Sequence, residues 1–206
     1  MVHKISIGFT DAERPRIAAL YWEAFQHKLR VAMGPEPAAL AFIAEQLNPD
    51  FALVARGAAR EVLGIAGFKT AKGALIDGGI TDLARHYGWL STCWRGPLLA
   101  LVERDLEADV LLMDGICVAS EARGMGLGTA LLQAVKDEAI AQGLRSVRLD
   151  VIDSNPRARA LYERQGFVPI GTQALGPLKW IFGFSSSTKM RWTRDQSGQT
   201  MPSSAS

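Results

Sequence analysis

The sequence predicts an α/β (α+β) fold in which helices flank a central sheet. Strand-like and helix-like segments alternate after Asp109, which is typical of chains that layer helices on a sheet. Before them come segments with the patterns of a strand, two helices and a pair of strands. The chain of 206 residues is long enough for one such domain, and the glycine-interrupted residues 70–108 are expected to form an insertion or lid with helical content.

The N-terminal elements are predicted from hydrophobic periodicity. Lys4–Phe9 alternates polar and apolar residues, as a half-buried strand does. Thr10 and Glu13 have the spacing of a capping box, but Pro15 indicates that the regular helix begins a little later. Apolar residues at helical spacing then continue to Leu29. The next expected elements are a second helix and two paired strands: Ala38–Leu47, Phe51–Ala55 and Glu61–Lys69.

The later elements follow the insertion. Within the insertion, Pro97 is well placed to open a helix over Leu98–Leu106, because proline suits the first helical position. We expect a single domain over residues 1–192, since residues 193–206 are rich in Ser and Gln, have little to bury and are typical of a flexible tail. The expected strands are Val110–Val118, Val147–Ile152, Phe167–Gly171 and Trp180–Trp192. The expected helices are Gly126–Gln142 and Pro156–Gln165.

The composition is that of an ordinary globular protein. Apolar residues make up 48% and charged residues 21%, and the formal net charge is +2 with no dense Lys/Arg run. This balance favours neither nucleic acid nor an anionic membrane surface as a partner. The N-terminus lacks the apolar core of a signal peptide, and no run of about 18 apolar residues is present to span a membrane. We therefore expect a cytoplasmic protein that binds neither nucleic acid nor membrane.

The metal-ligating residue types predict no metal site. Cys93 and Cys117 are too few and too oddly spaced for a disulfide framework or a zinc site. His3, His27 and His86 have no ligand-like spacing, and each is expected at the surface or as a cap.

The segment Asp114–Ala130 has the pattern of a strand, a glycine-rich loop and a helix. Glycines let the backbone approach a ligand closely and adopt dihedral angles that other residues avoid. The first amides of a helix are unpaired and the helix dipole adds partial positive charge, so an anion can bind there. An arginine beside the glycines can neutralise a phosphate. The predicted contact residues are Arg123, Gly124, Met125, Gly126, Leu127, Gly128 and Thr129.

Glycine spacing alone leaves open a turn that binds nothing, but it can be tested against two common phosphate loops. A P-loop requires Gly-Lys-Ser/Thr, whereas Gly128 is followed by Thr129 and Ala130. A dinucleotide fingerprint requires Gly-x-Gly-x-x-Gly, whereas the glycines here stand at 124, 126 and 128. Neither pattern fits.

Two motifs resemble those of the GCN5-related N-acetyltransferase (GNAT) superfamily. Arg123–Gly128 resembles its cofactor motif Arg/Gln-x-x-Gly-x-Gly/Ala, and Asn155–Phe167 resembles its segment Asn…Ala-x-x-Leu-Tyr-x-x-x-Gly-Phe. The ordered pair is more specific than either motif, and the close resemblance covers Val110–Gly171. It implies a central mixed sheet that is splayed in the middle and flanked by helices. It also implies acetyl-CoA as acyl donor.

The resemblance assigns roles to residues around the splay. It implies that the backbone of Ile116, Cys117 and Val118 pairs with the pantetheine arm of the cofactor, although a plain buried strand would also explain this segment. Asn155 directly before Pro156 has the form of a helix cap, which is a sufficient structural explanation. The resemblance adds that Asn155 also touches the cofactor.

Tyr162 lies about two helical turns after Asn155, on nearly the same helix face. The resemblance implies that it lies beside the cofactor sulfur, both as a contact and as the acid that protonates the departing thiolate. A phenol is neutral at pH 7 and can donate that proton. The alternative is packing in the core or at its rim.

A protonated amine must lose a proton before it attacks, and two aspartates are candidate bases. Asp114 is at an even offset from Ile116 and Val118, so the three are expected to share one face of the sheet. Asp150 matches a position that carries a base in some members of the superfamily. A salt bridge or a solvated strand end would explain either residue, and in that case the site would only position an already neutral amine.

The predicted function is therefore N-acetyltransfer, in which an acetyl or other short acyl group passes directly from acetyl-CoA to a primary amine of a small molecule or peptide. The alternative is a non-catalytic, regulatory acyl-CoA-binding module. An unpaired strand edge would allow a homodimer. Aromatic residues of the first helix and the insertion could line an acceptor pocket or belong to the core: Trp22, Phe25, Trp89 and Trp94.

Overall fold

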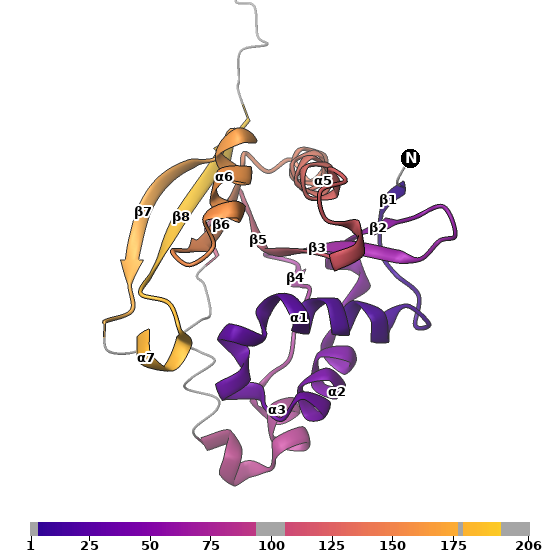
Figure 1. The fold of residues 1–206 in the computed structure, drawn as a ribbon, viewed down its shortest axis with the longest axis vertical. Helices are drawn as coiled ribbons and strands as arrows, with labels where there is room; N and C mark the ends of the chain where they lie inside the picture. The colour runs from indigo at the N-terminus through magenta and orange to yellow at the C-terminus, as the bar shows by residue number, and fades with distance from the viewer. Residues whose placement is uncertain (1–3, 94–105, 177–178, 195–206) are drawn as a thin grey trace, which may run out of the picture.

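The structure is a computed structural model that describes residues 4–93, 106–176 and 179–194 (Figure 1). Its centre is a mixed sheet with the strand order β1-β2-β3-β5-β6-β8-β7, and β4 pairs with β3 beside this path. The strands are β1 (Lys4–Ile7), β2 (Ala52–Arg56), β3 (Val62–Thr70), β4 (Gly73–Ala74), β5 (Val110–Val118), β6 (Ser146–Ile152), β7 (Val168–Ala174) and β8 (Ser186–Thr193). The helices are α1 (Arg14–Met33), α2 (Glu36–Gln46), α3 (Ile80–Tyr87), α5 (Leu127–Ala141), α6 (Pro156–Arg164) and α7 (Lys179–Phe182), with short 3-10 turns η1 (Pro49–Phe51) and η2 (Ser120–Ala122).

The predicted mixed sheet flanked by helices is confirmed, and most predicted elements agree with the structure to within a few residues. The single strand expected over Trp180–Trp192 is wrong. Residues Lys179–Phe182 form α7, Gly183 follows with a left-handed φ of 73°, and only Ser186–Thr193 joins the sheet. The expected tail therefore starts inside the last strand, at Thr193, and residues 195–206 lie outside the described residues.

The insertion over residues 70–108 is described in part. It contributes β4 and α3, and α3 packs against α2. Arg85 and His86 of α3 both contact the carboxylate of Glu45 in α2, at 2.8 and 2.7 Å, and the hydrogen bond with His86 lowers the pKa of Glu45. His86 therefore joins two helices. The helix expected over Leu98–Leu106 lies almost entirely outside the described residues.

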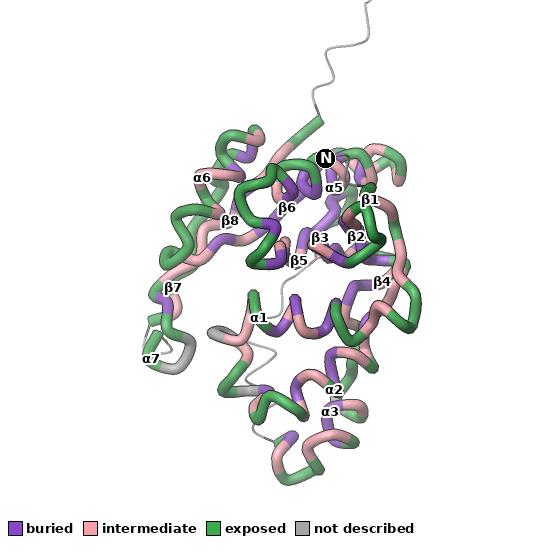
Figure 2. The backbone as a smooth tube through the Cα atoms, turned by 45° about the vertical axis from the view of Figure 1, so that its right-hand side comes forward, coloured by how far each residue is buried: buried purple, intermediate pink, exposed green. Residues whose placement is uncertain are grey.

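Helices cover both faces of the sheet at β1, β2, β3 and β5. The α1–α2 pair lies on one face and α5 on the other, and the most buried backbone runs through the central strands (Figures 1 and 2). The inward side of α5 is fully buried because its apolar residues recur at helical spacing. Burying a large aliphatic side chain contributes about 1.5–3 kcal/mol, so this face fixes α5 firmly on the sheet. The buried residues of α5 include Leu131, Leu132, Val135 and Ala139.

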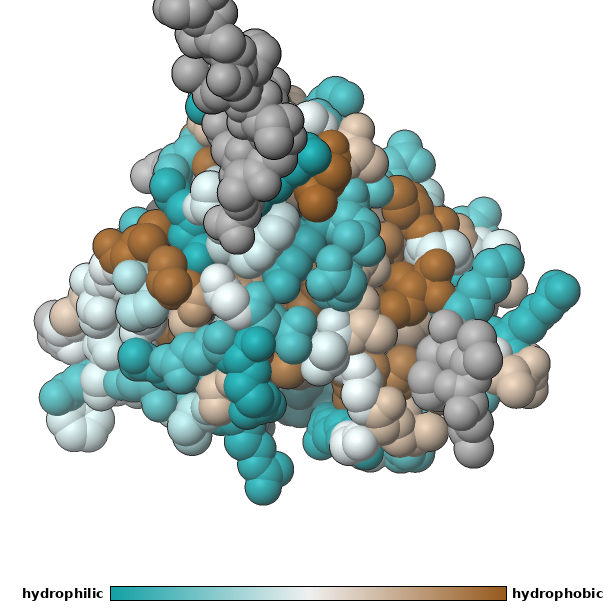
Figure 3. All heavy atoms as spheres, turned by 90° about the horizontal axis from the view of Figure 1, so that it is seen from above, coloured by the Kyte–Doolittle hydropathy of each residue, from teal (hydrophilic) through white to brown (hydrophobic). Residues whose placement is uncertain are grey.

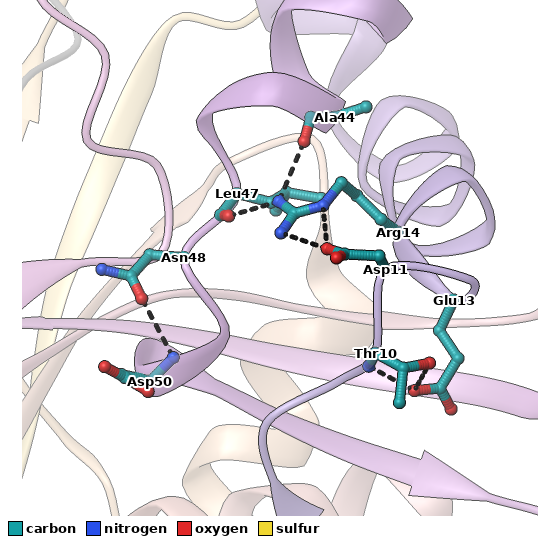
Figure 4. Close-up of polar contacts among 8 residues, drawn as sticks. All are labelled: Thr10, Asp11, Glu13, Arg14, Ala44, Leu47, Asn48 and Asp50. Atoms are coloured by element: carbon teal, nitrogen blue, oxygen red, sulfur yellow. Dashed lines mark hydrogen bonds and ion pairs between the residues drawn. The ribbon is translucent and has the colours of Figure 1, made fainter.

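Arg14, the first residue of α1, connects the start of α1 to the end of α2 (Figure 4). The Arg14 guanidinium donates hydrogen bonds to the carbonyl oxygens of Ala44 at 3.1 Å and Leu47 at 2.6 Å. Carbonyls at a helix C-terminus have no partner within the helix, so Arg14 caps α2 from α1. Asp11 accepts from the same guanidinium, and Asn48 caps the 3-10 turn that follows α2.

Glu13 ties the start of α1 to the end of β2. Its carboxylate accepts hydrogen bonds from the Arg56 guanidinium at 2.6 and 2.9 Å and from the backbone N–H of Thr10 at 2.8 Å. The hydrogen bond from Arg56 is the main cause that lowers the pKa of Glu13 to about 2. The predicted contact between Thr10 and Glu13 is therefore present, and regular helix begins at Arg14, immediately before Pro15.

Candidate functional site

The sheet is open between β5 and β6. The two strands pair in parallel only over Val110–Leu112 and Ser146–Arg148. Beyond these residues β5 continues to Val118 beside β3, while β6 continues to Ile152 beside β8. Among the described residues, no strand pairs with the β6-facing edge of β5 beyond Leu112, so the predicted splay is confirmed.

A bulge in β5 marks the beginning of the splayed segment. Gly67 of β3 is opposite Gly115, but the next residue, Phe68, is opposite Met113. Asp114 is therefore the extra residue of a β-bulge, a feature that bends a strand and redirects a side chain. The bulge places Asp114 where β5 turns away from β6.

The bulge bears on the prediction that Asp114 shares a face with Ile116 and Val118. A common face with Ile116 and Val118 requires unbroken alternation, and an extra residue interrupts that alternation. Ile116 and Val118 are half-buried and Cys117 between them is buried. Burial raises the pKa of the Cys117 thiol far above its ordinary value, so Cys117 offers backbone groups and not a nucleophile.

The glycine loop has the geometry of a ligand-facing turn. Gly124 and Gly126 adopt left-handed φ values of 81° and 79°, which favour glycine. In the described structure, a Cβ built on either residue would meet no atom within 4 Å, so the space above both is open. Gly126 is the N-cap of α5 and supplies no side-chain cap to its first amides. These features fit a phosphate that approaches the backbone at the start of a 15-residue helix.

The other loop residues divide into anchors and exposed positions. Leu127 is buried in the core, whereas Met125 and Thr129 are exposed. A Cβ on Gly128 would lie 3.2 Å from Cδ2 of Leu161, so the first turn of α5 packs closely against α6. The structure therefore brings the two motifs together, although they are separated by a helix and a strand.

Arg123 already has partners in this structure. Its guanidinium donates to the carbonyl oxygen of Val118 at 3.2 Å and pairs with Glu23 of α1 at 2.8 Å. A second pair, Arg16 with Glu121 at 2.8 Å, lies between α1 and the turn before the loop. Two ion pairs thus connect α1 to the loop, and a phosphate would compete with Glu23 for Arg123.

The helix that carries the second motif begins as predicted. The Asn155 side chain accepts a hydrogen bond from the backbone N–H of Ala158 at 3.1 Å, and Pro156 is the first helical residue. Asn155 remains exposed. Tyr162 is only 8% exposed, and its ring centroid lies 6.1 Å from that of Phe167. The capping prediction for Asn155 is confirmed, and the cofactor roles of Asn155 and Tyr162 stay predictions.

Asp150 lies in a basic part of β6. It is half-buried, and Lys189 of β8 is directly across from it in the register. Arg148, two residues earlier on the same face, is 4% exposed. Arg148 and Arg191 both donate to the Glu107 carboxylate, and the hydrogen bond from Arg148 lowers the pKa of Glu107. The sequence indicates this cluster only through charged residues within an apolar strand. It does not indicate that Glu107 joins them, because Glu107 is 41 residues from Arg148.

The four aromatic residues expected near the acceptor have different surroundings. Trp22 is buried in the core, Trp89 is 66% exposed, and Trp94 lies outside the described residues. Phe25 is half-buried and lies against Gly115 of β5: a Cβ built on Gly115 would be 2.2 Å from Cζ of Phe25. Phe25 is one of the aromatic residues predicted near the acceptor, but no pattern in the sequence indicates its contact with Gly115.

The described residues offer neither a metal-binding cluster nor a membrane-spanning helix. They contain no group of three or more His, Cys, Asp or Glu side chains placed to hold a metal ion. No helix within residues 4–93, 106–176 and 179–194 is both long and apolar enough to cross a membrane.

A family model described as the Acetyltransferase (GNAT) family matches residues 14–167. Among curated proteins, a mycothiol acetyltransferase from Beutenbergia cavernae is 47% identical over 53 residues. That match covers 26% of this chain and 18% of the relative, so the chain spans less than a fifth of the relative's length.

Solved structures show the same fold at low sequence identity. An N-acetyltransferase from Staphylococcus aureus Mu50 aligns with a TM-score of 0.66 at 16% identity, covering 92% of this chain and 100% of that one. A GCN5-related N-acetyltransferase from Kribbella flavida aligns with a TM-score of 0.61 at 21% identity, covering 93% and 98%. The ribosomal-protein-S18-alanine N-acetyltransferase from Escherichia coli aligns with a TM-score of 0.57 at 18% identity, covering 97% and 99%.

Proposed function

The chain belongs to the acetyltransferase (GNAT) family, and from this premise we propose that it transfers a short acyl group from acetyl-CoA directly to a primary amine. The observation that carries the proposal is an open glycine loop at the start of α5 together with a strand, β5, whose β6-facing edge pairs with no described strand beyond Leu112. The loop suits a pyrophosphate and the strand edge suits an extended amide-containing arm.

The residues that would hold acetyl-CoA are those around these two features. Arg123 and the loop backbone through Thr129 would bind the pyrophosphate, and the backbone of Ile116, Cys117 and Val118 would pair with the pantetheine arm. Asn155 would add a side-chain contact beside its cap. When bound, acetyl-CoA supplies an activated acyl group that an amine can take.

The chain supplies positioning and proton transfer. Asp114 or Asp150 would accept a proton from the amine as its nitrogen bonds to the acyl carbon. Tyr162 would donate a proton to the sulfur as the carbon–sulfur bond breaks. Holding both reactants at the splay replaces a bimolecular encounter with a step inside one complex, which is the main source of acceleration in such a site.

We favour Asp114 over Asp150 as the base. Asp114 stands at the bulge where β5 leaves β6, whereas Asp150 has Lys189 directly across from it and Arg148 on the same face. The pH–rate profiles of Asp114→Asn and Asp150→Asn separate the two: loss of the acidic limb in the first variant alone supports Asp114. An unchanged profile in both would mean that the site only positions a neutral amine.

The acceptor is proposed as a primary amine of a small molecule or peptide. A cytoplasmic setting is proposed with it, in keeping with the free cysteines Cys93 and Cys117.

A homodimer is proposed through the outer edge of β7, which pairs with β8 and with no other described strand. Val168 and Ile170 of this strand are 59% and 46% exposed. Seen from above, hydrophobic residues form separate patches among hydrophilic ones on the surface of the molecule (Figure 3). Light scattering of the purified chain and of Ile170→Lys tests this: a dimer that the variant disrupts supports it, and a monomeric parent refutes it.

The function is tested with purified protein, acetyl-CoA and a panel of amino acids, amino sugars, polyamines and short peptides. Amine-dependent release of free CoA thiol, with the acetylated amine detected by mass spectrometry, is the expected result. CoA binding without thiol release across the panel would favour the regulatory acyl-CoA-binding module instead. Absence of any CoA binding would reject both functions.

A further inference from the structure

Beside the bulge in β5, a cross-strand pair of glycines leaves the sheet without side chains. Gly67 of β3 and Gly115 of β5 are direct cross-strand partners, so both would direct a Cβ to the same face of the sheet. On that face Leu75 lies over Gly67, 2.3 Å from a Cβ built there, and Phe25 lies over Gly115, 2.2 Å from a Cβ built there. Real Cβ atoms essentially never show such distances, so both neighbours occupy space that only glycine leaves free.

The two covering side chains differ in exposure. Leu75 is 1% exposed and belongs to the core, whereas Phe25 is half-buried. Tyr21, one turn earlier on α1, holds the Phe25 ring from the side, with ring centroids 4.6 Å apart. Phe25 is therefore a fixed aromatic wall with one part packed on the strand and another part accessible.

The Phe25 ring lies beside the segment of β5 where the proposed acyl transfer would take place. Gly115 directly follows Asp114 at the bulge and lies in the segment of β5 that is no longer paired with β6. α5, which follows the glycine loop, lies on the opposite face of the sheet from α1 (Figure 1). An acyl chain attached to a pantetheine arm that enters from the α5 side would point through the splay toward α1.

We propose that Phe25 sets the upper limit on the length of the acyl group by closing the α1 side of the splay over Gly115. This inference rests on the proposed function, because it concerns the acyl-CoA donor of the same site. An acetyl group would end before the ring, whereas each further methylene would have to displace it. Removing the ring would open an apolar space in which each buried methylene improves affinity roughly fourfold.

Equilibrium binding tests the proposal without knowledge of the acceptor. Titration calorimetry with CoA, acetyl-CoA, butyryl-CoA and hexanoyl-CoA gives the ratio of butyryl-CoA to acetyl-CoA Kd for each variant. We expect this ratio to fall by roughly tenfold in Phe25→Ala, because two methylenes gain a site, while the Kd for CoA changes less than about threefold. Phe25→Leu, which keeps an apolar side chain on the strand, should lie between.

Phe9→Ala is the matched control. Phe9 is also a half-buried phenylalanine that packs on the core, but it follows β1 and carries the Arg14 guanidinium 5.2 Å from its ring centroid. The ratio of two Kd values from one preparation does not depend on the folded fraction, so a partly destabilised variant still gives an answer.

Each outcome decides the matter. An unchanged ratio in both Phe25 variants, or an equal change in Phe9→Ala, would overturn the acyl-length limit while leaving the proposed function standing. Failure of the parent protein to bind CoA would overturn the proposed function and this inference with it. A lowered ratio confined to the Phe25 variants supports the inference.

Discussion

At the scale of single residues, the Phe25 side chain leaves space only for glycine at position 115. Adding a methyl group there forces the Phe25 ring to move, because the built Cβ is 2.2 Å from Cζ. We expect Gly115→Ala to lower the free energy of unfolding by roughly 1–3 kcal/mol, the usual cost of overpacking. Gly171→Ala in β7 is the control, since a Cβ there meets no described atom within 4 Å. Urea denaturation measures both, and equal losses would exclude overpacking as the cause.

Tyr162 separates catalysis from binding. If its hydroxyl protonates the leaving thiolate, Tyr162→Phe should lower turnover by roughly 100-fold or more and leave the Kd for CoA unchanged. The matched control is Tyr87→Phe, because the Tyr87 hydroxyl donates to the Met33 carbonyl in the α1–α3 region. That variant should lose stability and keep its turnover. Full activity in Tyr162→Phe would leave this tyrosine with packing alone.

Glu13 makes stability depend on pH. Its pKa is lowered from 4.5 to about 2, so its pairing with Arg56 contributes fully above pH 4.5 and is lost as the pH falls toward 2. We expect Glu13→Gln to destabilise the protein by about 1–3 kcal/mol at pH 6 and by progressively less at pH 4 and pH 3. Asp11→Asn, at a carboxylate that is 93% exposed, should change little. A pH-independent difference for Glu13→Gln would contradict the assignment.

At the scale of elements, the start of α5 can be compared with its end. Gly126 and Gly143 have left-handed φ values of 79° and 74°, and a Cβ on either meets no described atom within 4 Å. Alanine at either position should therefore cost a similar roughly 1–2 kcal/mol of stability. Only Gly126→Ala should weaken CoA binding, by about tenfold or more, because it blocks charge-assisted hydrogen bonds from the loop. Thermal unfolding and calorimetry check both effects, and equal CoA affinities would place the pyrophosphate elsewhere.

The bounds of β5 followed from its apolar run, but its bulge did not. The run Val110–Val118 has the same residue pattern whether or not Asp114 is an extra residue, since only the register with β3 defines a bulge. The short helix α7 was also not predicted, because the apolar residues around Trp180 fit a strand as well as a single helical turn.

At the scale of the whole molecule, ion pairs join the glycine loop and the turn before it to the first helix. Glu23 pairs with Arg123, and both side chains are about half exposed, at 47% and 61%. A phosphate bound by the loop must displace or share this arginine, so cofactor binding should alter α1, the helix that carries Phe25.

Neutralising Glu23 should strengthen cofactor binding. We expect Glu23→Gln to lower the Kd for CoA by about two- to fivefold at low salt, and the gain should shrink at high salt because exposed charges are screened. Glu45→Gln removes a comparably exposed carboxylate, 43% exposed, that pairs with α3 and should leave the Kd unchanged. Calorimetry at two salt concentrations measures this. Weaker binding in Glu23→Gln would mean that the ion pair helps to hold the loop in its binding form.

The sequence by itself determined the features that depend on local backbone chemistry. A glycine at a left-handed position and an asparagine that caps a helix are written in residue type, so the loop of Gly124 and Gly126 and the cap at Asn155 could be predicted, and the family with them. Only the tertiary structure decided which distant side chains meet. Glu23 reaches Arg123 across 100 residues, and Phe25 lies on Gly115, because helix packing and strand register set these contacts. The backbone geometry of the loop is therefore determined locally, whereas its contact with α1 and the packing of Phe25 on β5 are properties of the fold.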